Sequence, residues 1–195
     1  MRGKRKINIV TLGCFKNVVD SEKLMRQIQS GGYCIVHDQD DTSAEAVIIN
    51  TCGFINDAKE ESIDTILRFI RAKQSGTIRN LYVMGCLSER YMDDLKAEMP
   101  EVSRYFGVNN FRDILGELGI VYNEKLASER NLTGPGHYAY LKVSEGCDRT
   151  CAFCAIPIIR GKYVSRPVGS LVDEARLLAE KGVKELILIA QDLSY

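Results

Sequence analysis

The sequence has no long apolar run and no excess of charge. Its apolar segments stay well short of the ~20 residues that a membrane-spanning helix needs. No apolar stretch of the kind found in secretory signals follows the basic first residues. The 26 Lys and Arg residues balance 26 Asp and Glu residues, so no global field favours nucleic acid or membrane. These absences predict a soluble cytoplasmic chain without membrane partners or direct contact with nucleic acid.

Internal repeats, low-complexity tracts, GxGxxG patterns and Walker motifs are also absent, so the usual nucleotide-binding signatures do not apply. Histidine is scarce. His37 and His137 lack partners at ligand spacing, and we expect structural or surface roles for both. Cysteine is plentiful by contrast, with seven residues. Without a secretory signal, these cysteines indicate a reducing compartment and thiols that serve as ligands rather than disulfides.

Three of these cysteines, Cys147, Cys151 and Cys154, lie within eight residues. Thiolates are soft ligands that suit zinc or iron–sulfur clusters. Closed structural zinc sites normally use four protein ligands. Three thiolates without a nearby fourth therefore favour a cubane cluster with one iron left open for a small molecule. The alternatives are three unrelated cysteines, or a zinc site that borrows a distant ligand.

Short apolar runs alternate with stretches in which apolar residues recur at helical spacing. The runs predict strands at 7–12, 33–38, 45–50, 81–84, 138–143 and 185–190. The spacing predicts helices at 17–30, 56–72, 89–99 and 111–118, and a last one that Ser170 caps and Gly182 ends. This alternation predicts an α/β fold with a parallel, Rossmann-like sheet. The Gly/Pro cluster at 133–136 predicts a boundary between domains 1–133 and 134–195.

Three more cysteines, Cys14, Cys52 and Cys86, each follow the end of an expected parallel strand by one or two residues. The carboxyl ends of parallel strands meet at one edge, so these thiols can converge there. Each adjoins a glycine, which permits tight turns (Gly13, Gly53 and Gly85). From the pattern alone they could equally be small buried hydrophobes. Cys34 matches neither triad, and we expect it in the core of its strand.

Two sets of motifs resemble known families. Cys-x3-Cys-x2-Cys after a strand, with Phe153 before the last cysteine, resembles the radical S-adenosylmethionine enzymes. The stretches Leu12-Gly-Cys-Phe-Lys-Asn, Asn50-Thr-Cys-Gly-Phe-Ile and Gly85-Cys-Leu-Ser-Glu-Arg look like the amino-terminal domain of the methylthiotransferases. The resemblance covers essentially the whole chain. It implies an amino-terminal methylthiotransferase domain followed by the truncated start of a radical S-adenosylmethionine partial (β/α) barrel.

The resemblance also implies two four-iron–four-sulfur clusters. Cys147, Cys151 and Cys154 would hold the one that binds S-adenosylmethionine, and Cys14, Cys52 and Cys86 an auxiliary one that carries sulfur. Phe153 would lie against the adenine and Gln191 near the methionine or ribose, although both could simply pack in the fold. Small polar residues near the auxiliary triad could tune it: Asn17, Asp20, Asn50, Thr51 and Ser88. For Asp20 and Ser88 we favour caps or turns, and no side chain suggests a general base.

The residues around the cysteines are most similar to those of the branch that modifies the β-carbon of an aspartate in the twelfth protein of the small ribosomal subunit. Phe15 departs from that branch, where proline is expected. An electron donor such as flavodoxin or ferredoxin would be a further partner.

Other readings remain open. One is a transfer-RNA isopentenyladenosine methylthiotransferase; others are a non-catalytic iron–sulfur or electron-transfer module and a zinc-binding interaction domain. A barrel of this type has six β/α units, and one unit plus one strand are present. We therefore expect a fragment whose short second part is unstable.

Overall fold

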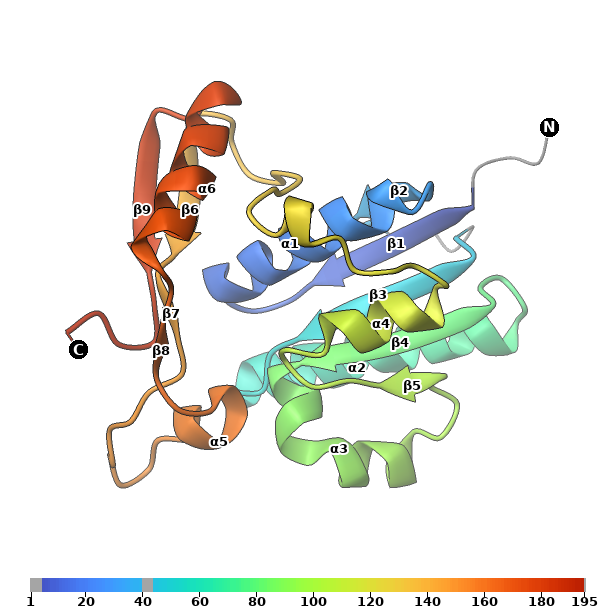
Figure 1. Ribbon diagram of the computed structural model, residues 1–195. Helices are drawn as coiled ribbons and strands as arrows, with labels where there is room; N and C mark the ends of the chain where they lie inside the picture. Colours follow the sequence, from blue (N-terminus) through green and yellow to red (C-terminus); the bar gives the residue numbers. More distant parts are fainter. Residues whose placement is uncertain (1–4, 40–43, 195) are drawn as a thin grey trace.

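A parallel five-stranded sheet forms the centre of the first part of the chain (Figure 1). The computed structural model describes residues 5–39 and 44–194. The strand order is β2-β1-β3-β4-β5, and every pairing between neighbours is parallel. The strands are β1 (Lys6–Thr11), β2 (Cys34–His37), β3 (Ala46–Thr51), β4 (Asn80–Gly85) and β5 (Arg104–Tyr105). The predicted parallel α/β sheet is confirmed, while β5 was missed because two residues carry no periodicity.

Helices cover both faces of this sheet. One face packs against α1 (Phe15–Ser30) and α4 (Phe111–Glu117), and the other against α2 (Asn56–Gln74) and α3 (Cys86–Glu98). Alternation along β3 explains the two layers, because successive side chains of a strand point to opposite faces. Ile48 belongs to the α1 cluster, whereas Val47 and Ile49 belong to the α2 cluster. A strand buried on both sides therefore reads as a continuous apolar run.

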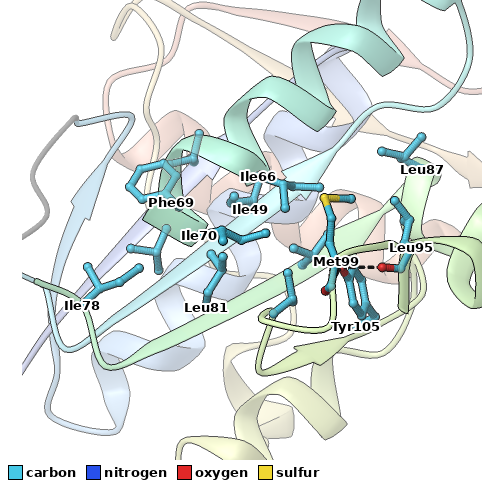
Figure 2. Close-up of a cluster of buried hydrophobic side chains, with 14 residues drawn as sticks. Ile49, Ile66, Phe69, Ile70, Ile78, Leu81, Leu87, Leu95, Met99 and Tyr105 are labelled. Atoms are coloured by element: carbon cyan, nitrogen blue, oxygen red, sulfur yellow. Dashed lines mark hydrogen bonds between the residues drawn. The ribbon is translucent and has the colours of Figure 1, made fainter. Parts of the chain in front are cut away.

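Figure 2 shows the cluster under α2 and α3, where Ile66 and Phe69 lie over Ile49. Tyr105 closes this cluster, and its hydroxyl donates to the carbonyls of Leu95 (3.0 Å) and Met99 (2.9 Å). Burial of the Tyr105 ring raises the pKa of its hydroxyl. The hydroxyl thus brings a large apolar ring into the core without leaving a polar atom unpaired.

The helical spacing of Ile63, Ile66, Leu67 and Ile70 predicts one apolar stripe on α2, and this prediction is only partly correct. Ile66 and Ile70 are buried, but Ile63 and Leu67 are more than a third exposed, and Phe69 takes their place in the core. The reason is tertiary, since Ile63 and Leu67 line an open groove between α2 and α3 instead of facing the sheet. Helix α3 also begins earlier than predicted, at Cys86 directly after β4.

The rest of the chain builds two smaller sheets. Strand β6 (Tyr138–Lys142) pairs in parallel with β9 (Glu185–Ile189), and β7 (Ser144–Glu145) pairs antiparallel with β8 (Val164–Ser165). A short 3-10 turn (Glu124–Leu126), α5 (Ile156–Arg160) and α6 (Val168–Glu180) complete this part. Leu186 and Leu188 of β9 are exposed, as expected for two parallel strands without further cover. The division into domains at residue 133 stays a prediction.

The two parts touch along α1 (Figure 1). The Phe15 ring stacks on Tyr140 of β6, with 4.2 Å between centroids. Fully buried Arg130 lies between Glu22 of α1 (3.3 Å) and Glu174 of α6 (3.1 Å). Glu174 was not among the residues singled out from the sequence, so this ionic contact was not foreseen.

Two local predictions are wrong. Cys34 is exposed rather than in the core, because β2 lies at the edge of the sheet with β1 as its paired neighbour. Ser170 does not cap α6, which begins at Val168 after Pro167. The Ser170 hydroxyl instead donates to the Pro167 carbonyl at 2.9 Å. Proline suits this position because its fixed φ leads into the first turn.

Among the helices of residues 5–39 and 44–194, none is both long enough and apolar enough to cross a membrane.

Replacing Phe69 with Ala should lower the free energy of unfolding by ~3–5 kcal/mol, because it opens a cavity in the core under α2. Leu67→Ala, on the same helix but 38% exposed, is the matched control and should cost less than half as much. Urea denaturation followed by circular dichroism measures both. Equal losses would contradict the assigned burial of α2.

Candidate functional site

The first cysteine triad lies at the carboxyl edge of the sheet. Cys14 precedes α1 as its N-cap, Cys52 follows β3, and Cys86 opens α3 after β4. The Asn17 amide ties two of these loops together, donating to the carbonyls of Leu12 (2.8 Å) and Thr51 (3.1 Å). The carboxyl ends of these strands therefore lie close together, as predicted.

Glycines let these loops approach closely. Gly13 has φ +88°, and a Cβ added there would lie 2.8 Å from the Cys52 sulfur. Gly85 has φ +101°, and a Cβ there would lie 2.5 Å from the Thr51 carbonyl oxygen. Larger residues cannot take these positions without moving a cysteine loop.

Arg160, at the end of α5, reaches across to this triad. It is 4% exposed, and its Nη2 donates to the Cys86 sulfur (3.1 Å) and to Asn17 Oδ1 (2.6 Å). Its Nη1 donates to Asp20 Oδ2 at 3.0 Å. Burial raises the pKa of the Cys86 thiol and Arg160 opposes this, while Cys14 and Cys52 add to the rise.

Sequence reasoning missed Arg160. The available signal was its place directly before Gly161, at the end of a short apolar segment after the cysteine loop.

The prediction that Asp20 is a cap or turn former is wrong. It lies inside α1, is buried, and pairs with both Lys142 and Arg160. Burial alone raises the pKa of Asp20, but the two cations outweigh it and the pKa is lowered. Glu145 completes the group, 2.6 Å from Lys142 and 3.5 Å from Arg160. Two cations therefore balance two anions, which limits the cost of burying them.

The other small polar residues brace the loops. Asn50 Nδ2 donates to the Asn17 carbonyl and to Ser21 Oγ, both at 3.0 Å. Thr51 Oγ1 donates to the Met84 carbonyl at 2.6 Å. Ser88 is not the expected cap, since Gly85 takes that position; its hydroxyl is buried without a hydrogen-bond partner among the described residues.

The second triad lies on the loop between β7 and α5. Cys147 is buried, Cys154 half-buried and Cys151 exposed. The Cys147 amide donates to the Gly161 carbonyl at 3.1 Å, and Gly146 (φ +75°) lies so close to Lys162 that a Cβ would clash with its carbonyl. Beside this loop is an open cavity of about 720 Å³, lined by residues 148–151 and Ser194.

Phe153 and Gln191 both have features that suit a ligand at this loop. The Phe153 ring is fully exposed and packs into no core of the described residues. Gln191 Nε2 donates to Glu145, while its Oε1 is buried without a partner in the described part of the chain. Contact of either residue with S-adenosylmethionine stays a prediction.

The two histidines have the structural contacts that we expected. His37 Nε2 lies 3.0 Å from Thr11 Oγ1, and the His137 ring packs edge-on against Tyr138.

The donor sets of both triads have the chemistry that an iron–sulfur cluster needs. Within residues 5–39 and 44–194, no group of three or more His, Cys, Asp or Glu side chains is drawn together tightly enough for one metal ion. Both triads consist of thiols alone, which are soft ligands. The first is also closely enclosed and has a cationic donor at Cys86, so its residues fit such a cluster.

The first half of the chain matches a known family, and the chain as a whole has named relatives. The model of the uncharacterized protein family UPF0004 matches residues 6–107. "Ribosomal protein uS12 methylthiotransferase RimO" of Phocaeicola vulgatus is 55% identical over 192 residues, which cover 98% of this chain and 44% of that protein. The protein of the same name in Cytophaga hutchinsonii is 56% identical, with the same coverage. The chain thus spans less than half the length of these relatives.

Among solved structures, the cobalamin-dependent S-adenosylmethionine radical enzyme OxsB with aqua-cobalamin bound is similar in fold, with a TM-score of 0.58. The match covers 97% of this chain and 34% of that chain at 12% identity, which supports the fold alone.

Gly13→Ala should destabilise the chain more than Gly76→Ala. Both glycines have φ in the left-handed region, so each substitution costs ~1–2 kcal/mol in backbone strain. Only Gly13 packs against a cysteine side chain, whereas the space around Gly76 is open among the described residues. Thermal unfolding of the two variants measures the difference, and equal melting temperatures would argue against the close packing of the Cys14 and Cys52 loops.

The contact of Arg149 with Asp192 should make the stability of the fold depend on pH under acidic conditions. The hydrogen bond from Arg149 (2.6 Å), helped by Ser194, lowers the pKa of Asp192 from 3.8 to about 2. Because the folded pKa is the lower one, this contact stabilises the fold above about pH 4, and the contribution is lost as pH falls toward 2. An NMR titration should find Asp192 near 2 and find it raised toward 3.8 in Arg149→Gln. A value near 3.8 in the unchanged chain would contradict the contact.

Proposed function

The chain belongs to the uncharacterized protein family UPF0004, and from this premise we propose that it forms part of a radical S-adenosylmethionine methylthiotransferase. The observation that carries the proposal is the pairing of two thiol triads in one fold. One triad lies at the sheet edge, and the other lies on the loop before α5. The names of the relatives support the same activity.

Cys147, Cys151 and Cys154 would hold the four-iron–four-sulfur cluster that binds S-adenosylmethionine. Cys14, Cys52 and Cys86 would hold the auxiliary cluster. When bound, the two clusters and S-adenosylmethionine would supply the electron transfer, the hydrogen abstraction and the methylthio group. Electrons would come from a flavodoxin or ferredoxin in the cytoplasm.

The chain's own residues would bind and orient S-adenosylmethionine. The Oε1 of Gln191, which has no hydrogen-bond partner among the described residues, can accept a hydrogen bond from an ammonium or ribose hydroxyl group. The exposed ring of Phe153 can cover an adenine. The 720 Å³ cavity beside Cys151 is open enough for a molecule of this size to enter.

In the complete enzyme, the proposed substrate is an aspartate of ribosomal protein uS12, modified at its β-carbon. This choice rests on the shared name of the relatives that match 98% of the chain. A transfer-RNA substrate has no comparable support among them. A non-catalytic iron–sulfur module is the contrasting hypothesis that assays must exclude.

Anaerobic reconstitution should load about eight irons and eight sulfides per chain, and about four in each triple variant, Cys14/Cys52/Cys86→Ala and Cys147/Cys151/Cys154→Ala. Two independent cubanes give this result, and iron and acid-labile sulfide analysis measures it. Cys34→Ala is the matched control, because it removes an exposed thiol outside both triads. Zinc without sulfide would refute the proposal.

Enzyme and carrier are then separated by adding reductant and S-adenosylmethionine to the loaded chain. Release of 5′-deoxyadenosine that depends on Cys147, Cys151 and Cys154 supports the enzyme. Cycling of the iron without this product in the complete protein supports the carrier.

A further inference from the structure

One short segment touches both cysteine triads. The Gly161 carbonyl accepts a hydrogen bond from the Cys147 amide, and the neighbouring Arg160 side chain donates to the Cys86 sulfur. Residues 160 and 161 are adjacent, so the backbone position that holds one triad also sets the position of a side chain at the other.

The Arg160 side chain is held in place from several sides. Asp20 accepts from Nη1, and Asn17 accepts from Nη2 alongside Cys86. Its guanidinium group is nearly free of solvent, with 2% of the side chain exposed. A planar donor with several partners loses little freedom when it bonds a further acceptor, which suits a fixed hydrogen bond to sulfur.

The contacts continue beyond Arg160 toward the second triad. Glu145 lies 3.5 Å from Arg160, bonds Lys142 and accepts from Gln191. An unbroken series of polar contacts therefore runs from the Cys86 sulfur to the Gln191 amide. Its members come from α1, β6, β7, α5 and the segment after β9.

We propose that Arg160 is a positioning residue that hydrogen-bonds the Cys86 ligand, raises the reduction potential of the auxiliary cluster and fixes its place relative to the second cysteine loop. This inference rests on the proposed function. A charged N–H donor stabilises the additional negative charge of a reduced cluster, and hydrogen bonds to sulfur are among the factors that set cluster potentials. Loss of the donor should therefore make the cluster harder to reduce.

The test uses the chain with Cys147, Cys151 and Cys154 replaced by Ala, so that the auxiliary cluster alone contributes to the signal. Arg160→Gln and Arg160→Lys are compared by redox titration followed with electron paramagnetic resonance. Arg166→Gln is the matched control: it removes the same charge close by, and Arg166 bonds the Lys142 carbonyl and Glu174 instead of a cysteine.

We expect a lower midpoint potential in Arg160→Gln, by about 59 mV if the equilibrium constant for reduction falls tenfold. Arg160→Lys keeps a charge beside Asp20 but cannot span Asn17 and Cys86 together, so its shift should be smaller and of the same sign. Arg166→Gln should leave the potential unchanged.

The two hypotheses fail in different ways. If iron and sulfide do not bind to the unchanged triad, the proposed function is refuted. If the cluster assembles and Arg160→Gln titrates at the parent potential, the role of Arg160 is refuted while the proposed function stands. Should Arg160→Gln not fold, Arg160→Lys decides by the same criterion, and an equal shift in Arg166→Gln would reduce the effect to general charge.

Discussion

The buried contact of Asp20 with Lys142 and Arg160 is the constraint on which the arrangement of the site depends. Asp20 comes from α1, beside the first triad, while its two cations come from β6 and from the end of α5. A buried charge that loses its partner is strongly destabilising, by ~3–5 kcal/mol. The three side chains therefore keep the cysteine loop before α5 next to the sheet edge. An ion pair on the surface would stabilise this arrangement far less.

The carboxyl edge of the parallel sheet explains why distant cysteines can act together. Three strands that are neighbours in the sheet, β1, β3 and β4, end there, and each is followed within a few residues by a thiol. The loops can pack this closely because Gly13 and Gly85 have positive φ and lack a side chain. Regular secondary structure provides the direction of approach, and glycine permits the final contact.

Both parts of the chain share the same interface. The stacked rings of Phe15 and Tyr140 and the buried charges of Arg130, Glu22 and Glu174 lie along α1, as does the Asp20 cluster. Phe15 stands where the resemblance led us to expect proline, and its ring stacks on Tyr140 in this chain. The buried ion pairs and the stacked rings together hold the two parts in one orientation.

The sequence by itself determined the α/β order, the helices of the first part and the placement of Cys14, Cys52 and Cys86 after the ends of strands. These features follow from local periodicity, from spacing and from the chemistry of thiols, which neighbours in the chain already express. Cys34, Ile63 and Asp20 were misjudged for one physical reason. Burial and pairing depend on which surfaces meet, and the edge position of β2 or the groove beside α2 is not encoded within a few residues. Only the tertiary structure decided that Arg160 reaches Cys86, because that hydrogen bond joins residues 74 positions apart.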